Sequence, residues 1–422
     1  MTRRMTVLVA GAAVAALGLT ACSGGSGSGT AAGGASSGDS AKKVTSIKLV
    51  AAEYSKDHTA AFWKQFADKY KARTGTTLDV QIVSWDAIDQ QSSTMIQNNN
   101  APDILNLNAY ASYAKDQLLY SADDVLSPAV KSDLLEAFVK SGTYQDKMYG
   151  MPDLSSARAL FYNKAMFAKA GIAAPPKTWD EFEADAKKLQ GLGGGSIGYA
   201  MPLGPEEAQG EFSIWLFNNG GDWKSGGKWT INSPKNVETL SFMKKLAVQD
   251  KVTQNNPGRT NRADAFNLFK SGNVGMVVGF SPLAADLDKD KKVSYGVAPM
   301  PVQGGGEPQT FGVTDYLMAF KKPGNQAAVK AFYDLYYQKD QVNAFIKAEG
   351  FLPVTKSGLA AFASAPQLKV YLDTLPNVHL TPTDDPTWDK VKLAVQQNIG
   401  AAINGDPKAT LDALQKTAEN GG

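Results

Sequence analysis

The chain has 422 residues, of which 43% are hydrophobic and 20% charged, a composition typical of a globular protein. Its 43 lysines and arginines nearly balance its 41 aspartates and glutamates. Nucleic-acid-binding proteins carry a basic excess that this chain lacks, so we expect no nucleic-acid partner. A chain of this length is too long for one hydrophobic core to serve comfortably, and two lobes are expected.

The N-terminus has the features of an export signal. Two arginines precede an apolar run from Met5 to Leu19, which is too short to span a membrane and ends in small residues. The sequence Leu19-Thr-Ala-Cys22 resembles the bacterial lipobox, in which the cysteine receives a lipid, and Cys22 is the only cysteine in the sequence. We therefore expect residues 1–21 to be a signal peptide, removed on export. Cys22 would carry a lipid with a palmitate chain. This lipid would anchor the protein to the extracellular face of the cytoplasmic membrane.

Residues 22–43 follow as a segment rich in glycine, serine and alanine, which predicts a flexible tether. Beyond it, strand patterns alternate with helix patterns, which favours an α/β fold with helices flanking each sheet. The helical pattern after the first strand carries Phe62, Phe66 and Tyr70 and is expected to end at Gly75. Strands are predicted at 44–52, 77–83, 104–107, 157–163, 274–278 and 295–300.

Two helix starts are marked by their capping residues. Thr178 with Glu181 three residues later matches a capping box, and Ser233 before Pro234 places proline in a first helical turn. A further helix is predicted at 263–270, and a helix is expected to begin near Trp85.

Several segments together resemble the family of extracellular solute-binding proteins that includes maltose-binding protein. Each segment is weak alone, but their order and spacing along the chain are specific. The segments are Ala101-Pro-Asp-Ile104, Asp146-Lys-Met-Tyr-Gly-Met-Pro152, Leu160-Phe-Tyr-Asn-Lys164, Ala170-Gly171, Pro175-Pro-Lys-Thr-Trp-Asp-Glu-Phe182, Thr230-Ile-Asn-Ser-Pro234 and Gly272 to Met276.

The resemblance implies a periplasmic-binding-protein-like fold of type II, with two α/β lobes joined by a hinge and a ligand cleft between them. Lobe 1 would comprise 44–155 with 301–353, and lobe 2 would comprise 156–300 with 354–420. The implied function is to bind a carbohydrate and deliver it to the permease subunits of an ABC importer. We expect a monomer that is not an enzyme and that needs no cofactor.

Sugars present hydroxyls to planar polar groups and C–H faces to aromatic rings. Such side chains follow the first three predicted strands, where an α/β lobe presents its ligand loops. For each of them the alternative is a loop residue that caps a helix or covers a lobe. The candidates are Glu53 and Tyr54 after the first strand, Trp85 after the second, and Asn106, Asn108 and Tyr110 at the third.

The resemblance also places residues of the crossing strand in the cleft. Ser156 stands where maltose-binding protein has a sugar-contacting acid, so that Asp153 or Arg158 would have to replace that contact. Arg158 lies within an apolar strand, and an unpaired charge there would be unfavourable, so it should meet an acid or a ligand. A structural pair with Asp153 is the alternative.

Six further candidates come from later segments of the chain. Glu211 belongs to a segment that contributes an acid, while Gly210 occupies the position of its stacking aromatic residue. Phe280 and Ser281 replace a stacking tryptophan, so we expect a ligand other than maltodextrin. Trp388 matches a stacking tryptophan, with packing between helix and lobe as the alternative. Asp315 and Tyr316 suggest a clamp for a hydroxyl group.

The alternatives are an enzyme, a metal-binding protein, and the same transport role with a different ligand. Residues 194–198 match the Gly-x-Ser-x-Gly pattern of hydrolases, but they lie in a glycine-rich segment that favours a hairpin loop, and the sequence holds only two histidines. Paired carboxylates for glycoside hydrolysis stay open. Two distant histidines offer no zinc or copper ligand set. A phosphorylated polyol or acidic sugar, held by Arg158, Arg259 or Arg262, is the alternative ligand.

Overall fold

The computed structural model describes residues 44–362, 369, 371 and 378–421. The predicted signal peptide, the lipid-bearing Cys22 and the tether lie outside the described residues and stay predictions. None of the described helices is both long enough and apolar enough to cross a membrane.

The first lobe is built on a mixed sheet with the strand order β14-β13-β3-β1-β2, in which β6 also pairs with β13. Strand β1 runs parallel to β2 and β3, whereas β13 runs antiparallel to β3 and β6. The predicted strands at 77–83 and 104–107 are confirmed. The strands are β1 (Ser46–Ala52), β2 (Thr77–Val83), β3 (Ile104–Leu107), β6 (Met151–Ala157), β13 (Thr310–Ala319) and β14 (Val378–His379), with a small ribbon of β4 (Thr143–Tyr144) and β5 (Lys147–Met148).

The second lobe has a four-stranded sheet with the order β12-β7-β11-β8. Strand β7 runs antiparallel to both β11 and β12, while β8 lies parallel to β11 at the edge. The strands predicted at 274–278 and 295–300 are confirmed, the second with an earlier end. The strands are β7 (Ala159–Asn163), β8 (Ile197–Ala200), β11 (Val274–Gly279) and β12 (Tyr295–Ala298), with a separate ribbon of β9 (Lys224–Ser225) and β10 (Lys228–Trp229).

Helices cover these sheets, as the residue patterns predict. Those of the first lobe are α1 (Thr59–Thr74), α2 (Ile88–Gln97), α3 (Ala111–Lys115), α4 (Ala122–Val125), α5 (Pro128–Asp133), α6 (Glu136–Ser141), α13 (Gln326–Tyr336), α14 (Lys339–Glu349) and α15 (Lys356–Phe362). Those of the second are α7 (Lys164–Lys169), α8 (Trp179–Gln190), α9 (Ala208–Phe217), α10 (Pro234–Lys244), α11 (Arg262–Lys270), α12 (Ser281–Asp290), α17 (Trp388–Ala402) and α18 (Pro407–Glu419), with a π-turn η1 (Lys245–Gln249) and a 3₁₀ turn η2 (Pro257–Arg259).

The helix ends follow the predicted capping chemistry with one difference. Helix α1 ends at Gly75, whose φ of 73° is left-handed and therefore suits glycine. At the start of α8, the Thr178 hydroxyl accepts from the Glu181 amide at 3.2 Å, as expected. The Glu181 carboxylate, however, accepts from the Lys177 amide rather than from Thr178, so only half of the capping box forms. Ser233 caps α10 through the Asn236 amide.

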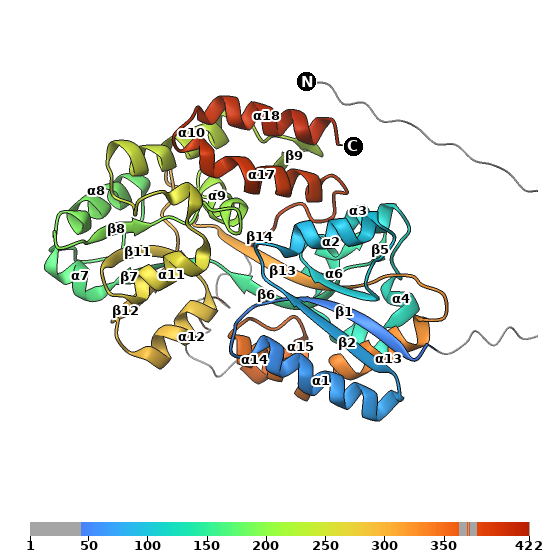
Figure 1. Ribbon diagram of the computed structural model, residues 1–422. Helices are drawn as coiled ribbons and strands as arrows, with labels where there is room; N and C mark the ends of the chain where they lie inside the picture. Colours follow the sequence, from blue (N-terminus) through green and yellow to red (C-terminus); the bar gives the residue numbers. More distant parts are fainter. Residues whose placement is uncertain (1–43, 363–368, 370, 372–377, 422) are drawn as a thin grey trace, which may run out of the picture. The chain divides into compact units, whose positions relative to one another are not determined.

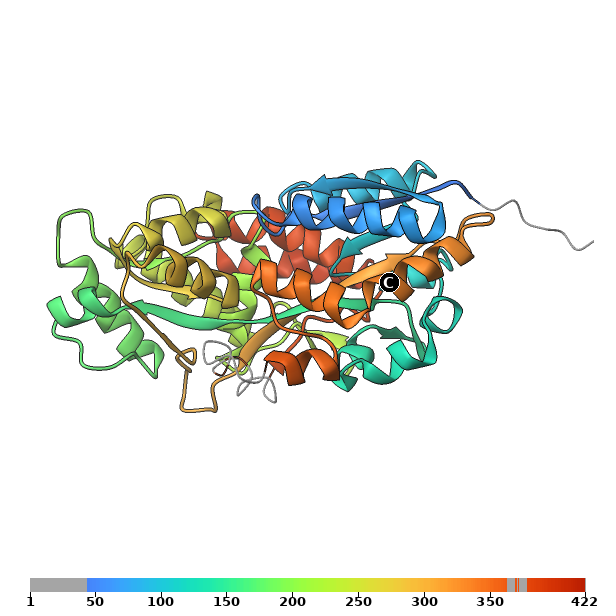
Figure 2. The ribbon, with the colours of Figure 1, turned by 90° about the horizontal axis from the view of Figure 1, so that it is seen from below.

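Two strands connect the lobes. Strand β6 of the first lobe continues through Arg158 into β7 of the second, and Figures 1 and 2 show this teal-green segment passing from one lobe to the other. The chain returns between β12 and β13. A third segment approaches where Leu352 forms a bridge with Ser155 of β6. The exact lobe boundaries stay a proposal.

Helix α17 is seated tightly on the second lobe. Its apolar residues Val391, Val395 and Ile399 are buried in the same core cluster as α8 and α9. Near its end, Gly400 meets the backbone of η2, and a Cβ there would lie 2.6 Å from the Gly258 oxygen. Because any side chain would force these backbones apart, α17 is expected to move together with the second lobe.

Candidate ligand-binding site

A tyrosine and an aspartate from distant parts of the first lobe meet where the lobes face each other. The Tyr54 hydroxyl donates to Asp315 Oδ2 at 2.8 Å. The half-buried Trp85 ring contacts Tyr54 edge-on, with 5.6 Å between ring centroids. The loops after β1 and β2 and the middle of β13 therefore bring together three of the predicted candidates.

Beneath this pair lies a second buried carboxyl that serves the first lobe. Asp153 of β6 accepts from Asn106 at 3.0 Å and from the Tyr336 hydroxyl. Asn106 in turn accepts from the Ala52 amide at 3.2 Å. Burial raises the pKa of Asp153 to about 8. Asp153 thus connects β6 with β3 and α13 through hydrogen bonds. The alternative prediction of a structural pair between Asp153 and Arg158 is wrong.

The partner of Arg158 is Glu207, which precedes α9. Their Nη2 and Oε1 atoms lie 2.7 Å apart, and the side chains are only 8% and 6% exposed. Arg262 at the start of α11 extends the network, since its Nε lies 2.9 Å from Glu206 Oε1 and 3.4 Å from Glu207 Oε2. Two arginines and two glutamates therefore form one buried ion-pair network on the second lobe.

Phe280 lies against both guanidinium groups of this network. The Arg158 guanidinium carbon lies 4.2 Å from the Phe280 ring centroid, and that of Arg262 lies 5.2 Å from it. Phe351 then links the lobes, because its ring lies 5.7 Å from Phe280 and 5.1 Å from Tyr54. An aromatic wall thus runs from the second lobe to the first along one side of the site.

The charges of both lobes act on Asp315. Burial raises the pKa of Asp315 to about 6, while Tyr54 and the cations Lys392, Arg262 and Arg158 counteract the rise. Lys392 belongs to α17, and the two arginines belong to the ion-pair network. Asp315 therefore experiences the positive charge of the second lobe as well as the hydrogen bond from Tyr54.

Three of the predicted site residues have a buried polar atom without a hydrogen-bond partner among the described residues. They are Asp315 Oδ1 on β13, and Arg158 Nε and Ser281 Oγ on the second lobe. A buried polar atom without a partner is unfavourable by about 1–3 kcal/mol, so several from both lobes indicate a place for a polar ligand.

Four predicted candidates are engaged in packing within a lobe. Tyr110 and Tyr316 contact each other at 5.2 Å between ring centroids, and their hydroxyls donate to Ser141 at 2.9 and 3.0 Å. Asp315 consequently has Tyr54, not Tyr316, as its tyrosine partner. Glu211 accepts from Trp215 and Tyr199 inside the second lobe.

The predicted stacking residue Trp388 is one of these four packed residues. Its ring is 1% exposed and lies between Trp223 and Trp229, at centroid distances of 5.3 and 6.4 Å. Trp388 therefore packs between its helix and the lobe, which was the alternative to a stacking role. A contact between Trp388 and a ligand stays a prediction.

The remaining candidates lie near the facing surfaces. Glu53 directly follows β1, and Ser156 is buried on β6 opposite Val313. Asn108 accepts from Lys392 across the lobes at 2.8 Å. Ser281 borders a cavity of about 660 Å³ between α12 and α14, which Phe351 also lines.

Sequence reasoning missed Glu207 and Lys392. In the sequence, Glu207 is one of three glutamates within residues 206–211, and Lys392 resembles any other lysine on a helix. The signal that could have found Glu207 is the charged Arg158 inside a strand, because a buried cation demands an anion nearby. For Lys392 the available signal was its spacing from Asp389 and Gln396, which places the three polar side chains on one side of the helix.

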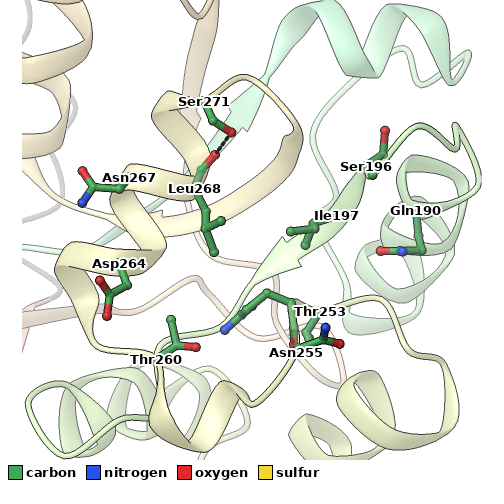
Figure 3. A pocket seen from close by; sticks show the side chains of 12 residues that line it. Gln190, Ser196, Ile197, Thr253, Asn255, Thr260, Asp264, Asn267, Leu268 and Ser271 are labelled. Atoms are coloured by element: carbon green, nitrogen blue, oxygen red, sulfur yellow. Dashed lines mark hydrogen bonds between the residues drawn. The ribbon is translucent and has the colours of Figure 1, made fainter.

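The Gly-x-Ser-x-Gly pattern spans the end of the loop after α8 and the first two residues of β8, so the predicted hairpin loop is wrong. Figure 3 shows Ser196 of this loop at the rim of a groove of about 770 Å³ between β8 and α11. The buried Gln254 of this groove is already engaged with the Met201 amide and carbonyl at 2.9 and 2.7 Å. The groove therefore lacks the unpartnered buried groups of the interlobe region.

The buried Glu211 provides a test of electrostatics that is separate from the ligand site. Burial raises the pKa of Glu211 to about 8 from a usual 4.5. A carboxyl whose pKa is raised by folding favours the folded state at low pH, and this contribution is lost as pH rises towards 8.

Glu211→Gln keeps an acceptor for Trp215 and Tyr199 but removes this titration. We expect the variant to be more stable than the natural protein by roughly 1–3 kcal/mol at about pH 8, and to gain little at about pH 5. Urea unfolding at both pH values measures the difference. An equal effect at both would show that Glu211 does not titrate with a raised pKa.

Comparison with known proteins agrees with this architecture. Residues 55–343 match the family of bacterial extracellular solute-binding proteins. A putative binding protein of Brucella abortus is 30% identical over 383 residues, which cover 88% of this chain and 92% of that protein. The diacetylchitobiose binding protein DasA of Streptomyces coelicolor is 26% identical, over 83% of this chain and 81% of that protein.

A solved structure shares the fold. The sugar transporter from Arthrobacter chlorophenolicus A6 with bound laminaribiose superimposes with a TM-score of 0.78 over 89% of this chain and 99% of that chain, at 19% identity. Two hinged α/β lobes with polar and aromatic groups facing each other define a solute-binding protein of periplasmic type II. The chain belongs to the family of bacterial extracellular solute-binding proteins.

Proposed function

We propose that this protein is the lipid-anchored extracellular component of an ABC importer that binds a neutral sugar or polyol between its lobes. It delivers this ligand to the permease and is not itself an enzyme. The observation that supports the proposal most directly is the set of unpartnered buried polar atoms contributed by both lobes. A polyhydroxylated ligand supplies both donors and acceptors, so one molecule can satisfy Asp315, Arg158 and Ser281 together.

The charge balance favours a neutral ligand over a phosphorylated one. Arg158 and Arg262 are neutralised by Glu207 and Glu206, and Lys392 is paired with Asp89. A phosphate would need cations that are not already paired, as phosphate sites are usually built. Arg259, the third arginine considered for that role, is exposed on η2.

Two of the similar proteins are associated with neutral sugars, whereas others, such as UgpB of Brucella abortus, are named for the phosphorylated polyol sn-glycerol-3-phosphate. DasA is named for diacetylchitobiose, and the Arthrobacter structure holds laminaribiose, both neutral sugars. Trp85 and Phe351 would provide the apolar surfaces for the ring faces, and Asp315 would accept from a hydroxyl. The lipid on Cys22 and the tether of residues 22–43 would keep the binding domain close to its permease.

The test is thermal melting of residues 42–422 against neutral sugars, polyols, phosphorylated polyols, amino acids and peptides. A true ligand at about 100 times its dissociation constant adds about 2.7 kcal/mol to stability and raises the melting temperature by a few degrees. Asp315→Asn should reduce the shift given by a sugar or polyol, whereas the exposed Arg259→Met should leave it unchanged. A shift with phosphorylated compounds alone would overturn the neutral ligand, and one with amino acids or peptides alone would overturn the sugar.

A further inference from the structure

Helix α17 carries a polar stripe that faces the first lobe. Asp389, Lys392 and Gln396 recur at intervals of three and four residues, which places them on one side of the helix. The apolar residues of α17 bind it to the second lobe, as its buried side chains and the contact of Gly400 with Gly258 show. The stripe therefore belongs to one lobe and meets the other.

The central contact of this stripe is a buried ion pair. Lys392 Nζ lies 2.8 Å from Asp89 Oδ1 of α2 and 2.8 Å from Asn108 Oδ1, which follows β3. The Lys392 side chain is 4% exposed. A lysine buried to this degree is favourable only while its partners stay in place, so these contacts depend on the lobes being together.

Two further contacts flank the ion pair. The Ser112 hydroxyl of α3 donates to Asp389, and Gln396 Nε2 lies 3.4 Å from Asp89 Oδ2. The interface thus joins one helix of the second lobe to α2, the loop after β3, and α3 of the first. All of these contacts join protein to protein, and their free energy does not depend on a ligand.

We propose that Lys392, with Asp89, Asn108, Asp389 and Ser112, forms an interlobe clasp that shifts the ligand-free protein towards the closed arrangement. Lys392 is then a positioning residue: it holds Asn108 at the edge of the site and sets the equilibrium between open and closed lobes. A ligand that binds the closed form gains apparent affinity in proportion to the closed fraction. The effect of the clasp on ligand affinity rests on the proposed binding function. The existence of the clasp does not.

The test measures the distance between the lobes without any ligand. Residues 42–422 contain no cysteine, so Lys115→Cys on α3 and Lys416→Cys on α18, both exposed, give two unique sites for spin labels. The protein is refolded from denaturant to remove any ligand from the expression host, and double electron–electron resonance gives the distance distribution.

We expect the protein with an intact clasp to show mainly the short distance of this structure. Lys392→Met leaves Asp89 without its cation in the closed form, and Asp89→Asn removes the charge from the other side. Each should lower the closed-to-open ratio at least about tenfold and move the distribution to longer distances. Lys392→Arg keeps the charge and should retain more of the short distance than Lys392→Met. Lys390→Met, at an exposed lysine on the same helix, is the matched control.

A purely structural role for Lys392 would lower the melting temperature without changing the distance, and this result would overturn the clasp. A mainly long distance in the protein with an intact clasp would also overturn it. If Lys392→Met does not fold, Asp89→Asn decides by the same criterion. Because no ligand is used, the clasp can hold even if the panel yields no sugar, so its failure and that of the proposed function are separate results.

Discussion

Arg158→Met is expected to destabilise the protein by about 3 kcal/mol or more, because it leaves Glu207 buried without its main cation. The ion pair is short, at 2.7 Å, and both side chains are nearly inaccessible to water. Arg262, at 3.4 Å from Glu207, can compensate only in part. Urea unfolding of residues 42–422 gives the difference in free energy.

The loss should depend on pH in a definite direction. Burial raises the pKa of Glu207 to about 7 even with Arg158 present, and removing the positive charge raises it further. At about pH 6 the lone carboxyl is protonated and the penalty shrinks, whereas at about pH 8.5 its ionisation is opposed and the penalty is larger.

Two companion variants complete this experiment. Adding Glu207→Gln to Arg158→Met should recover much of the loss and remove the fall in stability at rising pH that the unpaired carboxyl causes, since no carboxylate is left unpaired. The exposed Arg259→Met should change stability by less than about 0.5 kcal/mol. If Arg158→Met is as mild as Arg259→Met, the ion-pair network does not stabilise the fold as we describe.

Trp388→Ala is expected to destabilise the protein by about 3–5 kcal/mol, the range for deleting a large buried aromatic side chain. Its ring fills the space between Trp223 and Trp229, and α17 begins at this residue. Removing it would leave a cavity at the place where α17 joins the second lobe. Thermal and urea unfolding would show the loss directly.

Trp85→Ala is the matched comparison, since Trp85 is half-buried and contacts Tyr54 only at its edge. We expect it to change stability by about 1 kcal/mol or less, but to weaken binding of the sugar or polyol found in the panel by about 1 kcal/mol or more. Trp388→Phe keeps most of the packing and allows the binding role of Trp388 to be measured separately. A Trp388→Phe variant that folds normally but loses affinity would restore the stacking role.

The secondary structure was largely predictable because it depends on local patterns. Strand β2 lies at the predicted residues, and Gly75 ends α1 in the left-handed conformation that glycine favours. The misses were local too. The Glu181 carboxylate accepts from the Lys177 amide and not from the Thr178 amide. Residue spacing alone does not distinguish these two neighbouring donors.

The candidate site was predictable only in part. Tyr54 and Trp85 come together because loops at the ends of neighbouring strands converge, a rule that holds for any α/β lobe. Asp315 reaches Tyr54 from the middle of β13, which that rule does not predict. Tyr110 and Tyr316 instead pack against each other within the first lobe, and the hydroxyls of both donate to Ser141. Aromatic residues in a ligand loop and in a lobe core look the same in sequence.

The α/β class, the family resemblance and the absence of a basic excess could all be derived from the sequence alone, whereas the export signal and the lipid on Cys22 stay predictions. These properties depend on composition, periodicity and short motifs, which are local. Only the tertiary structure decided that Arg158 pairs with Glu207 rather than Asp153, that Trp388 packs between two tryptophans, and that Lys392 reaches Asp89. Each of these depends on which distant segments the two lobes bring together, because the energy of a buried charge or ring is set by its neighbours in space.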